Sequence, residues 1–291
     1  MENTWLYQGE EPIKIKKYLQ SLGMGHRLFN DIKRGSGTFK VDHRPVRPTT
    51  KILPNQPLTI KVQPEAEDLS VAVSHKPLAV VYEDDNWLVV NKQAGVPSIP
   101  GPTTDYNTIL NRVKGHLVAE DSPERRPHLV TRLDYNTSGL LLVAKHHVAQ
   151  SMISQQVEHH QLHKEYLVIV SGMINSDKGT INSPLARVPG QARRVVDPDG
   201  DPALTEYEVL KRGNGWTLVR AILKTGRTHQ IRVHFSSIGH PLLGDQLYGG
   251  DTALIDRQAL HAVKFGFHDP FTGEQRNFEA ELPADMKKLI N

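Results

Sequence analysis

Residues 128–143 read HLVTRLDYNTSGLLLV, and this stretch places one carboxylate between two apolar runs. Asp134 follows the apolar pair Leu129 and Val130, and the turn-forming residues 136–139 separate it from the apolar Leu140. We therefore expect Asp134 at the end of a strand, with its side chain directed into a cleft. A turn in which Asp134 only accepts backbone hydrogen bonds explains the same pattern.

A second segment, KTGRTHQIRVH at 224–234, joins an expected strand at 216–223 to an expected helix at 230–238. Helix N-termini present free backbone amides, so cations and amide side chains at this junction favour anion binding. The segment is not a Walker A loop, because it lacks the Gly-Lys-Ser/Thr sequence and the glycine that precedes it. A loop rich in glycine and proline, GHPLLGDQLYG, follows at 239–249.

A third segment, KEYLVIVSG at 164–172, begins an apolar strand with Tyr166. Most tyrosines in such a position pack against the core and keep the hydroxyl in water.

The hydrophobic pattern predicts an α+β fold. Alternating or apolar runs predict strands at 78–82, 87–91, 139–143, 165–170, 204–210 and 261–267, besides 216–223. Helices are expected around 109–117, 152–157 and 230–238. Short turns join neighbouring strands more often than helices do. A mixed, mainly antiparallel central sheet with flanking helices is therefore expected, rather than a doubly wound parallel one.

The N-terminal part of the chain differs in charge from the rest. Residues 1–62 hold eleven basic and five acidic side chains, a net charge of +6, whereas the whole chain carries +3. This asymmetry favours a polyanionic partner such as RNA or DNA, although a solvated basic surface has the same composition.

The same N-terminal part predicts a small α/β module. Residues 15–22 form a helical stripe that Gly23 can cap, a second short helix ends at Gly35, and Leu58, Ile60 and Val62 alternate as in a half-buried strand. Two helices and a strand pair supply few apolar residues, so the module should depend on RNA or on the main domain for order. We expect the module at 1–63, a linker at 64–77 and a catalytic domain at 78–291.

Composition narrows the protein class further. The 291 residues include no cysteine, which excludes disulfides, thiolate nucleophiles and cysteine zinc sites and fits a reducing cytoplasm. No apolar run approaches the ~20 residues that span a bilayer, and the N-terminus lacks a secretory pattern, so no membrane association is expected. His159 and His163 have helical spacing, but no third ligand is evident and no metal site is expected.

These segments, in this order, resemble the RluA-type family of RNA pseudouridine synthases. The signature block Arg-Leu-Asp-x-x-Thr-Ser-Gly stands complete at 132–139, and the Lys-x-Tyr strand, the Gly-Arg-Thr-His-Gln-Ile-Arg-x-His segment and the Gly-His-Pro-Leu-Leu-Gly-Asp loop also match. A weaker match is Glu83-Asp84 with Val90-Asn91-Lys92 and Gly95. The similarity covers roughly residues 78–283. Thr131 and Gln93 depart from the family's usual histidine and proline. More loosely, the N-terminal module resembles an S4-like RNA-binding domain.

The resemblance implies the pseudouridine synthase fold and a set of site residues. It implies catalytic roles for Asp134, for Arg227 as its guanidinium partner and for Tyr166. By this resemblance, Tyr166 lies against the uracil and assists proton removal from ring carbon five. It also implies that Arg132 fills the base stack when the uridine is extruded. The expected substrate-binding residues are Arg132, Thr137, Lys164, Leu223, Thr228, His229, Gln230 and Arg232.

The implied reaction breaks the bond between sugar and base nitrogen, turns the base and rejoins it through ring carbon five. Nothing is gained or lost, so no cofactor is expected. The carboxylate either attacks the anomeric carbon or removes a proton from the neighbouring sugar carbon, and the sequence does not choose between these routes. We expect a cytoplasmic monomer, without an obligate protein partner, that acts on structured RNA, with ribosomal RNA ahead of transfer RNA.

Two other functions compete with this hypothesis. One is a catalytically silent RNA-binding protein, against which the intact Asp134, Tyr166 and Arg227 argue. The other is a glycoside hydrolase, which usually needs two carboxylates, whereas the Asp134 block supplies one.

Overall fold

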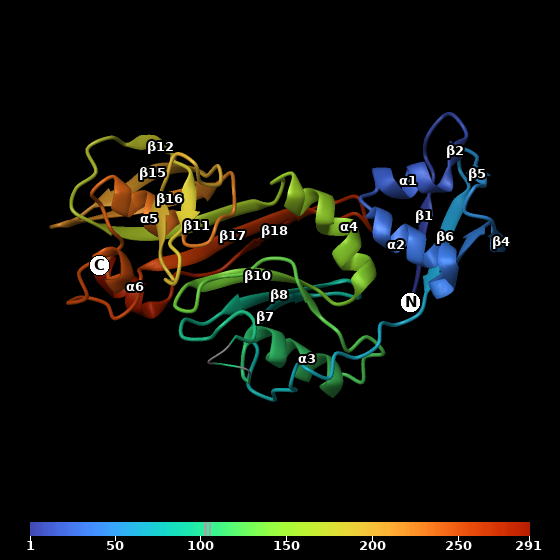
Figure 1. Ribbon diagram of the computed structural model, residues 1–291, viewed down its shortest axis with the longest axis horizontal. Coiled ribbons are helices and arrows are strands. Elements are labelled where there is room, and N and C mark those ends of the chain that lie inside the picture. The colour runs from blue at the N-terminus through green and yellow to red at the C-terminus, as the bar shows by residue number, and fades with distance from the viewer. Residues whose placement is uncertain (102–103, 105) are drawn as a thin grey trace.

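The computed structural model of the protein describes residues 1–101, 104 and 106–291, which form two larger sheets and two strand pairs with helices around them (Figure 1). The larger sheet has ten strands in the order β12-β15-β16-β11-β17-β10-β8-β7, with β18 beside β17 and β9 beside β10. Its strands are β7 (Val80–Glu83), β8 (Trp87–Lys92), β9 (His128–Leu129), β10 (Ser138–Ala144), β11 (His163–Ser171), β12 (Lys178–Asn182), β15 (Leu204–Arg212), β16 (Trp216–Leu223), β17 (Leu260–His268) and β18 (Gln275–Glu279).

The pairing in this sheet confirms the predicted fold class. Strands β10 and β17 run parallel, and the other pairs are antiparallel. Helices pack around it (Figure 1), and a small two-stranded hairpin forms a separate sheet. These elements are α3 (Ile109–Ala119), α4 (His147–Glu158), α5 (Gln230–Ser237), α6 (Ala284–Ile290), the 3-10 turn η2 (Gln246–Tyr248), and the hairpin strands β13 (Leu185–Arg187) and β14 (Arg194–Val196).

Strand β10 is the centre of the catalytic domain, because each of its seven residues is buried. Leu141 and Val143 pack with Val113 of α3, whereas Leu140 and Leu142 share the opposite core with α4. A strand covered on both faces reads as a continuous apolar run, as 140–143 does. Burying one such leucine contributes about 1.5–3 kcal/mol.

The start of β10 requires glycine. Gly139 has φ +113°, and a Cβ there would lie 2.3 Å from the carbonyl oxygen of Ala262 on β17. A side chain would therefore push apart the two parallel strands that position the residues just before Gly139.

The N-terminal module contains more strands than the sequence predicted. The order β1-β6-β3-β4 forms a four-stranded sheet, and β2 pairs with β5. Only Trp5 of the first strand is buried, so its sequence shows no alternation strong enough to predict a strand. The elements are β1 (Glu2–Leu6), β2 (Ile13–Lys14), α1 (Ile15–Ser21), α2 (His26–Asp31), the π-helical turn η1 (Ile32–Ser36), β3 (Gly37–Val41), β4 (Arg44–Val46), β5 (Lys51–Ile52) and β6 (Pro57–Val62).

The module rests against helix α4 (Figure 1). Val148 and Met152 of α4 belong to the same buried cluster as the module's own core. The indole of Trp5 donates a hydrogen bond to the carbonyl oxygen of Pro270 (3.1 Å). At Gly23, φ is +106° and a Cβ would lie 2.2 Å from the carbonyl oxygen of Met152. The module therefore leans on the main domain, one of the two supports expected from its thin core.

The predicted linker is anchored along its path. Glu65 accepts a hydrogen bond from His128 (2.5 Å), and the ammonium of Lys114 on α3 lies 2.9 Å from Glu67 and 2.7 Å from the carbonyl oxygens of Asp68 and Val71. None of the helices that the described residues form is long and apolar enough to cross a membrane.

Candidate active site

Asp134 lies in a tight turn between β9 and β10. The backbone amide of Thr137 donates to the carbonyl oxygen of Asp134 (3.1 Å), which closes the turn. Ser98 clamps the preceding residue, because its hydroxyl donates to the carbonyl oxygen of Leu133 (2.7 Å) and accepts from the Leu133 amide (3.0 Å). The backbone of the turn is thus satisfied by the protein, and the Asp134 carboxylate is left to face the cavity.

A buried lysine supports the same turn through hydrogen bonds to backbone carbonyl oxygens. Lys92, at the end of β8, is 1% exposed and donates to the carbonyl oxygens of Gln93 (3.0 Å), Val96 (2.8 Å) and Tyr135 (2.9 Å). Burial lowers the pKa of Lys92 to about 7, and the charge of Asp134 opposes this shift. Lys92 therefore fixes the residue next to Asp134 and titrates near neutral pH.

The Asp134 carboxylate is paired with Arg232 of helix α5. Nη1 of Arg232 lies 3.1 Å from Oδ2 of Asp134, and its Nε and Nη2 donate to Asp245 at 2.7 and 2.8 Å. Asp245 is 1% exposed, so one planar guanidinium bridges a buried and a half-buried carboxylate. Burial alone would lower the pKa of Arg232, but the bonds to Asp245 and Asp134 raise it, so the guanidinium stays charged.

This pairing corrects the expectation for Arg227. Its Nε donates to the carbonyl oxygen of Pro202 (3.1 Å), and its backbone amide donates to Oε1 of Gln230 (3.0 Å). Helix α5 begins only at Gln230, after His229 in the left-handed conformation (φ 59°). Position 227 therefore lies in the preceding turn, whereas position 232 lies on the buried face of the helix.

His229 connects the site to the loop after α5. Its Nε2 lies 3.8 Å from Oδ2 of Asp134, and its Nδ1 shares a hydrogen bond with the hydroxyl of Tyr248 (2.9 Å). Burial lowers the pKa of His229, and Asp134 opposes this shift while Arg232 adds to it. The imidazole is thus neutral at pH 7, and Arg232 supplies the positive charge beside Asp134.

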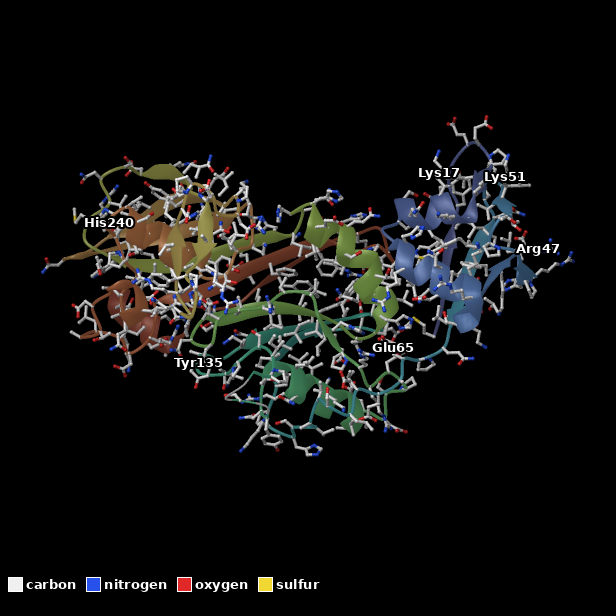
Figure 2. The ribbon with its side chains drawn as sticks, viewed as in Figure 1. Lys17, Arg47, Lys51, Glu65, Tyr135 and His240 are labelled. Carbon is white, nitrogen blue, oxygen red and sulfur yellow. The ribbon has the colours of Figure 1, made fainter. Side chains whose placement is uncertain are left out.

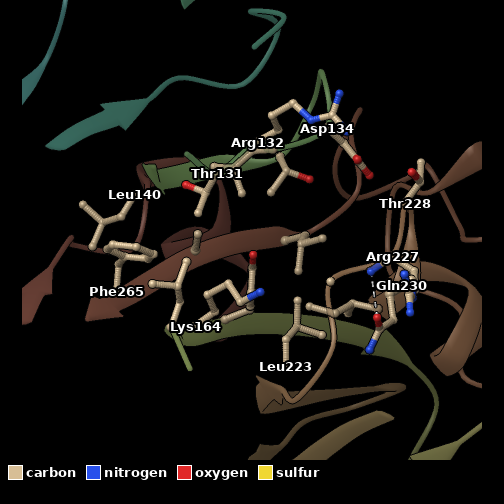
Figure 3. Close-up of a pocket in the computed structure, with 18 of the residues that line it drawn as sticks. Thr131, Arg132, Asp134, Leu140, Lys164, Leu223, Arg227, Thr228, Gln230 and Phe265 are labelled. Carbon is tan, nitrogen blue, oxygen red and sulfur yellow. Dashed lines mark hydrogen bonds between the residues drawn. The ribbon is translucent and has the colours of Figure 1, made fainter. Parts of the chain in front are cut away.

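Asp134, His229 and Arg232 line a cavity of about 350 Å³, which is large enough for one nucleoside (Figure 3). Thr131, Arg132 and Asp134 lie on one side, and Lys164 and Leu223 lie on the other. Tyr166 of β11 also lines the cavity and is 8% exposed. Burial, with a further contribution from Asp134, raises the pKa of Tyr166, so its hydroxyl stays protonated at neutral pH. Asp134, Tyr166 and Arg227 thus share one cavity.

The structure also brings the other predicted residues to this cavity. Arg132 is exposed, and it lines a second cavity of about 320 Å³ as well. Gln230 is 2% exposed and uses its amide inside the protein, because Nε2 donates to the carbonyl oxygen of Leu204 (3.0 Å) and Oε1 accepts from the backbone at 227. The remaining lining residues among those predicted are Thr137, Lys164, Leu223, Thr228, His229 and Arg232.

Sequence reasoning missed four supporting residues: Ser98, Asp245 and Tyr248 altogether, and Lys92 as a support of the turn. Lys92 and Asp245 stood inside matched segments, which was the available signal for both. Both residues lie far from Asp134 along the chain, so a local sequence pattern does not predict their contacts at the site.

A metal ligand set occurs elsewhere. Within the described residues, Glu83, His116 and Glu120 bring ligand atoms within 4.8 Å of one another. Both carboxylate oxygens of Glu83 are already engaged, Oε2 by His116 (2.7 Å) and Oε1 by Lys145 (2.6 Å). The pair His159 and His163 is not helical, because α4 ends at Glu158 and β11 begins at His163.

Comparison with known proteins identifies the family. The RNA pseudouridylate synthase family matches residues 86–237, which include Asp134, Tyr166 and Arg232. The uncharacterized RNA pseudouridine synthase YjbO of Bacillus subtilis (strain 168) is 39% identical over 95% of this chain and 98% of its own length. The chain belongs to the RNA pseudouridine synthase family. It is thus an isomerase that acts on RNA, and the RluA-type resemblance is confirmed.

Other family members extend the comparison. Ribosomal large subunit pseudouridine synthase D of Yersinia pestis is 37% identical over 84% of this chain and 79% of its own length. The solved structure of Human RNA Pseudouridylate Synthase Domain Containing 1 superimposes with a TM-score of 0.60 and 26% identity, covering 72% of this chain and 84% of that one. The pseudouridine synthase fold predicted from the sequence is therefore confirmed.

Proposed function

We propose that this pseudouridine synthase modifies large-subunit ribosomal RNA and that Asp134 carries its chemistry. The observation that carries the proposal is the single carboxylate among the described lining residues, which Arg232 holds (3.1 Å) at the edge of a nucleoside-sized cavity. The choice of RNA draws support from relatives named ribosomal large subunit pseudouridine synthase D.

The arrangement suits both routes open to the carboxylate. In the reaction the C1′–N1 bond breaks, a C1′–C5 bond forms, and the proton at C5 is exchanged for one at N1, so atoms balance without a co-reactant. Attack on C1′ and removal of the neighbouring sugar proton both need Asp134 ionised. Arg232 meets this need, because a guanidinium favours the charged form of a carboxylate.

We assign Tyr166 to the base rather than to the sugar. Its ring is buried beside Asp134, and its raised pKa keeps the phenol protonated. A neutral phenol offers the uracil a packing surface and a hydrogen-bonding hydroxyl, but it is a weak base for the C5 proton.

We propose that Arg132 fills the space that the extruded uridine leaves in the base stack. It is exposed and lies between two cavities, on the same short segment as Asp134. Extruding a uridine costs a few kcal/mol, and a planar guanidinium in the vacated space offsets part of that cost.

The glycoside-hydrolase alternative has little support. Among the described residues that line the cavity, Asp134 is the one carboxylate. Asp245 lies behind it, buried and bonded twice to Arg232, and is not available as a second catalytic acid.

We also propose that the N-terminal module binds RNA. Lys17, Arg47 and Lys51 are exposed on its surface, and Arg47 and Lys51 lie on the side far from the catalytic domain (Figure 2). We further propose a monomer that works in the cytoplasm, which sedimentation and cell fractionation would test.

The RNA target is tested by mapping pseudouridine in RNA from cells that lack the enzyme. That RNA is incubated with the purified protein, treated with carbodiimide and read by primer extension. We expect a new stop in large-subunit ribosomal RNA. A stop that appears only in transfer RNA would overturn the proposed target, and no stop in any RNA would overturn the proposed activity.

A further inference from the structure

The wall of the cavity opposite Asp134 carries two cations with no assigned role. Lys164 projects from the start of β11 into the cavity (Figure 3). Its ammonium lies 3.1 Å from the position that a Cβ on Gly226 would occupy, so it packs against the backbone beside Arg227. The two side chains therefore come from distant parts of the sequence and line the same cavity.

Among the described residues, no carboxylate pairs with either cation. Within the described part of the chain, the Lys164 ammonium has no hydrogen-bond or salt-bridge partner, and Arg227 uses only its Nε, on Pro202. Burial lowers the pKa of Lys164, which shows that holding the charge at this position has a desolvation cost. A charge held in this way without a partner is typical of a binding site rather than of a structural ion pair.

The charge of the whole cavity supports this interpretation. Its described lining holds five lysine and arginine side chains and one carboxylate. Arg232 takes that carboxylate, and Lys264 lies 3.6 Å from Glu279 outside the lining. Three cations of the described lining, Arg132, Lys164 and Arg227, are thus left without a carboxylate partner, and Lys164 and Arg227 are free to bind an anionic group of the ligand. A uracil ring is neutral, whereas each nucleotide of an RNA strand brings one negative phosphate.

We propose that Lys164 and Arg227 bind a phosphodiester group next to the target uridine. The Arg227 guanidinium has both terminal nitrogens available within the described structure and suits two phosphate oxygens, and the Lys164 ammonium adds a point charge. Gly226 exposes its backbone between them without a side chain. His160 at the rim faces both cations; burial and these charges lower the pKa of His160, so it adds no further positive charge at pH 7.

This site would act as an anchor for the extruded nucleotide. The phosphate would be held on one wall, while Asp134 meets the sugar from the other (Figure 3). Arg227 then contributes to substrate binding rather than to the charge state of Asp134, which accounts for its turn position five residues before Arg232.

The test compares Lys164→Met, Arg227→Gln and the double variant with Lys178→Gln. Lys178 is a surface lysine on β12, 3.2 Å from Glu208 and outside the cavity, and serves as the matched control. Tritium release from total RNA labelled at uridine C5, taken from cells that lack the enzyme, gives kcat and KM at several potassium chloride concentrations. This assay does not depend on which RNA is the target.

We expect each single variant to lower kcat/KM about tenfold or more through KM. The slope of log kcat/KM against log salt should flatten by about 0.7 for each phosphate that the variant no longer neutralises. Because the two side chains share one phosphate, the double variant should lose less than the product of the single losses. Lys178→Gln should match the parent.

Stability gives a second readout. Lys164→Met removes a half-buried charge that has no partner among the described residues. The variant should therefore unfold at the same temperature as the parent or higher, as substitutions at binding sites often do. A lower unfolding temperature would assign Lys164 a structural role. A loss confined to kcat, with an unchanged salt slope, would place the contact on the uracil, and either result would overturn the phosphate site. If the parent is active and the variants have the same kcat/KM as the parent, the phosphate site is also overturned. An inactive parent would instead count against the proposed function of the enzyme.

Discussion

The catalytic cavity and the N-terminal module use positive charge in opposite ways. In the cavity, Arg232 is buried and makes three bonds to two carboxylates, so its position is fixed within the protein. On the module, Lys17, Arg47 and Lys51 are exposed and point to solvent (Figure 2). The buried arginine positions the Asp134 carboxylate and favours its charged form. The exposed basic residues attract the phosphates of an RNA chain without a fixed register. Catalysis in the cavity therefore requires particular residues at fixed positions, whereas RNA recruitment by the module requires only a sufficient density of positive charge.

The largest expected effect separates the two arginines of the cavity. Arg232→Met should lower kcat on the order of a thousandfold, because Asp134 loses its charge partner. It should also destabilise the fold by about 3–5 kcal/mol, since Asp245 is left buried and unpaired. Arg227→Gln should leave kcat nearly unchanged. Single-turnover tritium release and thermal unfolding measure these effects.

Arg232→Lys controls for unfolding in this experiment. It keeps the charge near both carboxylates but cannot reproduce the bidentate bond to Asp245, so it should fold and remain well below the parent rate. Equal losses of kcat in Arg232→Met and Arg227→Gln would contradict the assigned ion pair.

A smaller effect tests the module. Deleting residues 1–62 would uncover Val148 and Met152 of α4, so a change of charge is the cleaner experiment. The triple variant Lys17→Gln, Arg47→Gln and Lys51→Gln should bind RNA about tenfold more weakly, and its salt slope should flatten by about two if each residue meets a phosphate. Its kcat and unfolding temperature should match the parent. An unchanged salt slope in filter-binding titrations would remove the module from RNA recruitment.

A further effect is a pH dependence of stability. The pKa of Lys92 is about 7 in the folded protein, below its ordinary value, so the unfolded chain binds more protons between these two values. The free energy of unfolding should therefore rise with pH from about 7 towards 10, and Lys92→Met should show a shallower rise. Urea unfolding of both proteins from pH 6.5 to 9.5 measures the difference. Parallel curves would mean that Lys92 does not titrate in this range.

Much of the fold followed from periodicity. Strand β16 has the predicted bounds 216–223, and the helix predicted around 109–117 was found at Ile109–Ala119. Strand β1 was missed because it buries only Trp5, and its edge pairing with β6 is set by the rest of the module. Hydrophobic alternation reports burial, so strands with one buried side chain escape it.

The site was predicted to the level of the segment but not of each contact. The segment at 224–234 contains both arginines, and its residues do not show where helix α5 begins. That start, after His229 in the left-handed conformation, turns Arg232 and not Arg227 towards Asp134. Likewise, the support of the Asp134 turn by Lys92 depends on the pairing of β8 with β10, which a local pattern does not reveal.

The central claim is that the charge of Asp134 performs the isomerisation, and Asp134→Asn tests it most directly. Asparagine has nearly the same shape and keeps the backbone bond that closes the turn with Thr137, so folding and RNA binding should persist. Tritium release from RNA labelled at uridine C5 should fall to background, while the parent releases label from each target site. Release by Asp134→Asn at a rate near that of the parent would contradict the account.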